Sequence, residues 1–201
     1  MDFELIKNKY AFCCSWAIWK PIDLKKKAKY GMEDISFFDD FKKLKLKTDI
    51  ILVGLNISGK IKKPFSNFHP LHKTAHDYKI RYALQNTIFW GCYMTDIIKD
   101  FEEVMSSNVN KYLKENPNFE MKNIIYFENE LIDIHSQNTI LIAFGNLSYK
   151  ILNKNFKNKF EIYKVSHYSS CISKEKLREQ FLKNENEINL KKKIRFLKNL
   201  L

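Results

Sequence analysis

Short, continuously apolar runs are the first pattern along this chain. Residues 49–55 (DIILVGL) are apolar and β-branched, as expected for a strand that is buried on both faces. Three further runs, at 91–98, 138–145 and 160–166, have the same character. The pattern therefore predicts four strands.

Between these runs, apolar residues recur every three or four positions, which is the period of an amphipathic helix. The segments 76–90, 123–136 and 146–156 follow this period, and 172–201 is mostly helical with Ser173 as its N-cap. A helix is therefore expected between each strand and the next.

Alternating strands and helices are typical of a parallel sheet with helices on both faces. We expect a single α/β domain over 1–201, a three-layer α/β/α sandwich around a four-stranded parallel sheet. In such open sheets, ligands bind outside the carboxyl ends of the strands. Those ends are where functional residues are sought.

The composition supports a packed core, with 45% hydrophobic and 14% aromatic residues. No run approaches the ~20 apolar residues that cross a bilayer. The first residues carry an acid at position 2 and lack the pattern of a signal peptide. We therefore expect a soluble, cytoplasmic protein that does not associate with membranes.

The net charge of +12 favours a polyanionic partner such as DNA. Arg81, Arg178 and Arg195 are the only arginines, so 32 of the 35 cationic residues are lysine. Specific readers of bases or phosphates usually favour arginine. The charge supports DNA binding without establishing it.

Two groups of residues raise the question of a metal. Cys13, Cys14, Cys92 and Cys171 lack C-x-x-C spacing and are most simply buried thiols. The segment 69–77 carries three histidines and Asp77, but Pro70 interrupts any helix through them and no cysteine is near. We expect no metal and no redox cofactor.

Polar residues follow three of the predicted strands. Asn56 comes after the first, Thr95 and Asp96 after the second, and a third group after the fourth, namely Ser166, His167 and Ser169. Because parallel strands end at the same edge of a sheet, these side chains are expected to lie near one another.

In order and spacing, these segments resemble the motifs of the uracil-DNA glycosylase superfamily. GLNISG (54–59) resembles the first motif, especially in its mismatch-specific and single-strand-selective branches, and SHYSS (166–170) resembles the second. KPFSN (63–67), GCYMTDIIK (91–99) and ILIAFGNLSYKIL (140–152) are similar to the aromatic segment, the base-reading strand and the third-strand turn. The likeness covers roughly residues 49–172 and implies a uracil-DNA-glycosylase-like fold.

The resemblance implies a role for each matching residue. Asn56 would orient the attacking water, and His167 would donate a hydrogen bond to O2 of the departing base. Phe65 or Phe68 would stack on the flipped base. Gly54, Leu55 and Asp96 would complete the base-binding site. Contacts to DNA would come from Ser58, Ser166 and Ser169, with Tyr168 or Ile172 as the wedge that fills the gap in the stack.

Three positions depart from the family pattern. Ile57 and Tyr168 stand where proline is usual, and Asp96 stands where the family has a base-reading asparagine. An ionised aspartate only accepts hydrogen bonds, so it favours the exocyclic amine of cytosine over O4 of uracil. The substrate is then uracil or a modified cytosine-type base. Asp96 is also open to two other interpretations, as a helix cap or as a protonated acid.

The leading hypothesis is a monofunctional, monomeric DNA glycosylase without a lyase step, because no lysine occupies a nucleophile's place in either motif. Action on modified phage DNA, in defence, fits Asp96 better than housekeeping DNA repair. The alternatives are a catalytically silent binding module for nucleic acid or nucleotides, and an unrelated doubly wound enzyme acting on small nucleotides.

Overall fold

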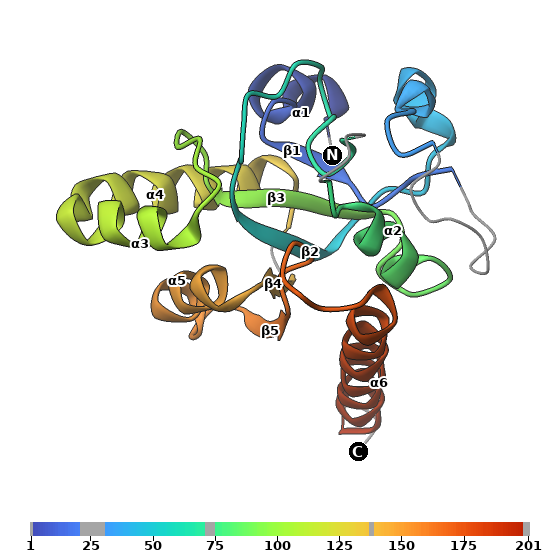
Figure 1. Ribbon diagram of the computed structural model, residues 1–201. Helices are drawn as coiled ribbons and strands as arrows, with labels where there is room; N and C mark the ends of the chain where they lie inside the picture. The colour runs from blue at the N-terminus through green and yellow to red at the C-terminus, as the bar shows by residue number, and fades with distance from the viewer. Residues whose placement is uncertain (1, 21–30, 71–74, 137–138, 199–201) are drawn as a thin grey trace.

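A five-stranded sheet forms the centre of the protein (Figure 1). The computed structural model describes residues 2–20, 31–70, 75–136 and 139–198. The strands are β1 (Cys14–Trp16), β2 (Lys47–Asn56), β3 (Cys92–Ile98), β4 (Ile140–Phe144) and β5 (Glu161–Val165). The helices are α1 (Phe3–Tyr10), α2 (Tyr78–Leu84), α3 (Ser106–Glu115), α4 (Pro117–Asp133), α5 (Asn146–Phe156) and α6 (Lys174–Lys198), with a 3-10 segment η1 (Ser36–Lys43).

The order of the strands is β1-β3-β2-β4-β5, and the four predicted strands β2 to β5 are parallel. The predicted number of strands, four, is nevertheless one too few. The N-terminal β1 adds a fifth, which pairs antiparallel with β3 so that Cys14 lies opposite Thr95. The protein is therefore of the α/β class with a mostly parallel sheet.

Alternate residues of each strand face opposite helical layers, because side chains along a strand point to alternate faces. Ile51 and Val53 of β2 face a core built with α1, α3, α4 and α5. Ile50 and Leu52 face a second core built with α2 and α6. Figure 1 shows α6 extending away from the sheet, with the C-terminus at its far end.

Several helical boundaries differ from those predicted. α5 begins and ends as expected, whereas α2 is shorter than the expected helix over 76–90. It stops at Gln85, whose ψ of 129° lies outside the helical region, and Asn86 follows with a positive φ of 62°. α1 and α3 were not predicted. In the described part of the chain, no helix has the length and apolar character needed to cross a membrane.

A buried ion pair connects β3 to the helical layer made by α4. Nζ of Lys99 lies 2.6 Å from Oε2 of Glu130, and the two side chains are 4% and 0% exposed. Tyr93 and Thr95 donate hydrogen bonds of 2.7 and 2.9 Å to the other oxygen of Glu130. One oxygen of Glu130 thus accepts two hydrogen bonds from β3, and the other faces the ammonium group of Lys99.

Removing one member of this pair is expected to be costly, since an unpaired charge would remain buried. Glu130→Gln should lower the free energy of unfolding by about 3–5 kcal/mol in urea titrations. Lys154→Met is the matched control, because the Lys154–Glu120 pair is solvent-exposed on the lysine side and should contribute less than about 1 kcal/mol. Equal losses in the two variants would contradict this assignment.

Candidate functional site

Several of the predicted site residues lie at the carboxyl edge of the sheet. Gly54 and Asn56 are two residues apart at the end of β2, and Gly54 lies opposite Asp96 of β3 in the ladder. Phe144 and Val165, at the ends of β4 and β5, belong to the core on the α2/α6 side, and His167 follows Val165 by two residues. The topology therefore places Asn56, Asp96 and His167 at the same edge of the sheet.

The side-chain amide of Asn56 is held in one orientation. Its Nδ2 lies 2.9 Å from the carbonyl oxygens of Ile57 and Phe101 and 2.8 Å from that of Glu103. Three acceptors at one end of an amide require that end to be nitrogen, because an oxygen there would be repelled. Oδ1 accepts no hydrogen bond from any described residue and is left as an acceptor for a ligand or water.

His167 is fixed in a single neutral tautomer. The backbone N–H of Ser169 donates to its Nδ1 at 3.2 Å, and the Ser169 hydroxyl lies 2.7 Å from the same nitrogen. A backbone N–H can only donate, so Nδ1 carries no proton and the ring proton is on Nε2. Burial lowers the pKa of His167 to about 4. Nε2 is therefore a neutral hydrogen-bond donor at physiological pH.

A glycine allows the His167 ring to approach β4. Gly145, directly after β4, has a φ of 86°, and a Cβ placed on it would lie 3.2 Å from Cβ of His167. Its N–H also donates to the Val165 carbonyl at 2.8 Å. A side chain at position 145 would strain the backbone and crowd Cβ of His167, so the glycine helps to position the histidine.

Asp96 lies within β3 rather than after it, which corrects the sequence-based placement. It is 3% exposed and does not begin a helix, so the interpretation as a helix cap is wrong. Burial raises its pKa to about 6, while a hydrogen bond from Asn67 and the charge of Lys99 lower it. The carboxyl group is therefore mostly ionised at pH 7 and protonates in mildly acidic solution.

Gly54 leaves the space that this carboxylate occupies. A Cβ on Gly54 would lie 2.0 Å from Oδ1 of Asp96 and 3.4 Å from Cζ of Phe68. The neighbouring Leu55 points to the opposite core, on the α1/α4 side. Of these two predicted base-binding residues, Gly54 faces the site, whereas Leu55 can present only its backbone to it.

The two candidate stacking residues have different environments, although both have positive φ, 60° for Phe65 and 65° for Phe68. Phe65 packs against Phe3 and Phe38 in the α1/α4 core, so the interpretation of Phe65 as a base-stacking residue is wrong. Phe68 lies beside Gly54 and Asp96, on the side of the candidate site. Phe68 is itself 2% exposed and packs in the α2/α6 core, but it is the one of the two rings on the side of the candidate site.

Tyr168 packs inward, which contradicts its predicted role as a DNA wedge. Its ring stacks on His167 with centroids 4.3 Å apart and meets Phe144 and Phe68 edge-on at 5.4 and 6.5 Å. Its hydroxyl is hydrogen-bonded to Asp77, a buried acid whose pKa is raised to about 7 by burial. Tyr168 thus connects the His167 loop to the start of α2.

The remaining predicted DNA contacts are only partly accessible. Ser166 bonds Gln180 through both its backbone N–H and its hydroxyl, and Ile172 packs against the α2/α6 core, which leaves little of it free to act as a wedge. Ser169 is exposed, but its hydroxyl is hydrogen-bonded to Nδ1 of His167. Ser58 is exposed in the loop after β2.

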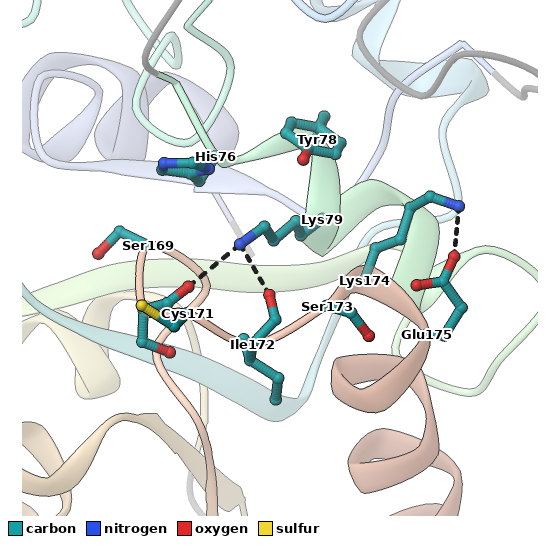
Figure 2. Close-up of a pocket in the computed structure, with 10 residues that line it drawn as sticks. His76, Tyr78, Lys79, Ser169, Cys171, Ile172, Ser173, Lys174 and Glu175 are labelled. Atoms are coloured by element: carbon teal, nitrogen blue, oxygen red, sulfur yellow. Dashed lines mark hydrogen bonds and ion pairs between the residues drawn. The ribbon is translucent and has the colours of Figure 1, made fainter.

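A separate, open pocket of about 480 Å³ lies beside the His167 loop (Figure 2). Its walls are the start of α2 and residues 169–175, so it does not include Asn56 or Asp96. Figure 2 shows Lys79 reaching across to this loop, where its Nζ donates to the carbonyls of Ser170 and Ile172 at 3.2 and 2.8 Å. Lys79 therefore holds the loop that carries His167.

No group of three or more metal-ligating side chains occurs among the described residues. His72, one of the histidines in the predicted 69–77 segment, lies outside them. Comparisons of the chain with protein-family models, curated proteins and solved structures give no match.

Asn67 and Lys79 were not singled out from the sequence, and Asp77 was considered there only as a possible metal ligand. Asn67 is buried between two phenylalanines in the PFSNF segment, and a polar residue at such a place was the available signal. Asp77 and Lys79 offer no comparable pattern, because their partners lie about 90 residues away in the loop after β5.

Gly54→Ala tests the close approach of Asp96. The added Cβ should lower the free energy of unfolding by at least 1–3 kcal/mol, the usual effect of overpacking. Asp96→Ala should remove most of that penalty in the double variant, as a double-mutant cycle of denaturant unfolding would show. Gly59→Ala is the matched control, since a Cβ there meets nothing within 4 Å. Additive effects of the Gly54 and Asp96 substitutions would disprove the contact.

Proposed function

We propose that this protein is a uracil-DNA-glycosylase-like enzyme that hydrolyses the N-glycosidic bond of a base flipped out of DNA. The observation that carries the proposal is the pair of fixed polar groups at one edge of the sheet. Asn56 presents an amide oxygen that no described residue hydrogen-bonds, and His167 presents a neutral Nε2–H. These are an acceptor for a water and a donor for a departing base.

Asn56 supplies the acceptor side of the reaction. Its Oδ1 would accept a hydrogen bond from the attacking water and orient the water toward C1′ of the sugar. An amide is a weak base, so its contribution is orientation rather than proton removal. The three carbonyl contacts at Nδ2 lock that orientation before substrate binds.

His167 supplies the donor side. As the glycosidic bond breaks, negative charge grows on the base, and Nε2–H would hydrogen-bond its O2. A donor fixed in advance where charge develops is an effective source of transition-state stabilisation. With a pKa near 4, the imidazole stays neutral and acts as a hydrogen-bond donor rather than as a proton donor.

Asp96 supports a cytosine-type base over uracil. One of its carboxylate oxygens accepts a hydrogen bond of 2.9 Å from Asn67, and the other lies over Gly54. A mostly ionised carboxylate attracts an exocyclic amine and repels a carbonyl oxygen. A cytosine modified at C5, of the kind that marks foreign DNA, is the substrate class that fits; a role in defence against phage follows from that fit.

Contact with DNA is supported by the loop after β2. Lys60, Lys62 and Lys63 are exposed there, four to seven residues after Asn56. Lysines near the reacting sugar would bind the flanking phosphates by charge attraction, which weakens with salt.

One observation favours the second candidate, a catalytically silent nucleic-acid or nucleotide-binding module. The Tyr168 ring contacts both His167 and Phe68, and therefore takes up space beside the face on which a base would stack. Excision requires this ring to turn aside when a base enters, whereas a silent module can keep it in place.

The two candidates are separated by an alkali-cleavage assay on oligonucleotides carrying uracil, hypoxanthine or modified cytosines. An enzyme produces alkali-labile abasic sites, and Asn56→Ala and His167→Ala should each slow excision by about 10²–10³-fold. Asn155→Ala and His135→Ala are matched controls away from the site and should retain full activity. DNA binding without abasic product from any base would favour the silent module.

Asp96→Asn tests the base preference. An asparagine can donate as well as accept, so the ratio of excision rates for uracil over cytosine-type bases should rise at least tenfold. Glu161→Gln is the control, because it removes a partly buried carboxylate at the start of β5, the opposite end of that strand from His167, and it should leave the ratio unchanged. An unchanged ratio in Asp96→Asn would show that this residue does not read the base.

A further inference from the structure

Asn67 lies beneath the candidate site with its side chain fully engaged. Nδ2 donates to the Cys13 carbonyl at 3.0 Å and to Oδ2 of Asp96 at 2.9 Å, while Oδ1 accepts from the Phe68 N–H at 3.1 Å. Because a donor and an acceptor are each fixed from outside, the amide cannot rotate without breaking buried hydrogen bonds. The amide of Asn67 therefore always directs an N–H group toward Asp96.

This hydrogen bond divides the two oxygens of Asp96 between different tasks. Oδ2 is occupied by Asn67, whereas Oδ1 lies over Gly54, close to Cζ of Phe68, and accepts no hydrogen bond from a described residue. An isolated buried carboxylate would take up a proton and become a mixed donor and acceptor. The amide N–H of Asn67 opposes that change.

We propose that Asn67 is the positioning residue that determines base preference, because it keeps Asp96 charged and leaves a single oxygen of Asp96 to accept from an exocyclic amino group. This inference rests on the proposed excision activity and deepens it. The site would then select bases with an amine at the Watson–Crick edge, as cytosine and its C5-modified forms have.

Other charged and titratable groups also act on Asp96. Lys99, at the end of β3, favours its ionised form, whereas Glu130 of α4 opposes it. Two further groups lie within electrostatic range on the α2/α6 side, Asp77 before α2 and Tyr168 in the loop after β5, and Cys13 lies near it on the N-terminal side. Unlike these groups, Asn67 hydrogen-bonds the carboxylate of Asp96 directly.

The test follows the Asp96 carboxyl carbon by ¹³C NMR during a pH titration, with Asp96→Asn used to assign the signal. Burial raises the pKa of Asp96 to about 6, and loss of the Asn67 donor raises it further. Asn67→Leu should move the midpoint upward by about one pH unit or more, and Asn67→Asp should move it further because two carboxyls would then share a proton. Asn184→Leu, another buried asparagine, is the control and should leave it unchanged.

The same variants are then assayed for excision across pH 5–8. The acid limb for a cytosine-type base should shift upward with the NMR midpoint, so that Asn67→Leu loses about tenfold in relative rate near pH 6. An unmoved NMR midpoint overturns the role of Asn67 whatever the activity. If the midpoint shifts in Asn67→Leu but the wild-type protein excises no base, the proposed function is overturned instead. If the midpoint shifts and the acid limb of the excision rate does not, the link to base preference is overturned.

Discussion

The candidate site depends on one steric constraint, the close approach of the Asp96 carboxylate to the backbone of Gly54. In a parallel sheet whose strands are buried on both faces, a charged side chain has almost no room. Glycine at position 54 creates that room, and the Asn67 amide provides the hydrogen bond that the charge requires. Phe68 then closes over the same position. The geometry of the site follows from a missing Cβ.

Buried charge is treated differently on the two faces of the sheet. On the α1/α4 side, Lys99 and Glu130 neutralise each other and fix β3 against α4. On the α2/α6 side, Asp96 has an amide partner rather than a full counter-charge, and burial raises its pKa toward neutrality. The first arrangement suits a permanent structural link. The second leaves a group that can respond to a ligand or to pH, which is the behaviour expected at a functional site.

Much of the sheet could be predicted, because β2, β3, β4 and β5 are short runs whose apolar residues by themselves indicate buried strands. β1 could not, because three residues carry little periodicity and its strand character comes from pairing with β3. At the site, Asn56 ends β2 and His167 follows β5, so both could be located from the strand pattern alone. Phe65 and Phe68 could not be distinguished, since positive φ at both turns the loop so that one ring enters each core. The roles of Asn67 and Asp77 depend on partners distant in sequence, which a single chain does not reveal.

The N-terminal segment has a part in the site that its position in the chain conceals. The carbonyls of Ala11 and Cys13 accept from Phe65 N–H and Asn67 Nδ2, and the Ser15 hydroxyl donates to the Phe65 carbonyl. These bonds anchor the loop that carries Asn67 and Phe68. In the described part of the sheet, β1 is an edge strand that pairs with β3. The conformation of this loop at the candidate site therefore depends on residues 50 or more positions earlier in the chain.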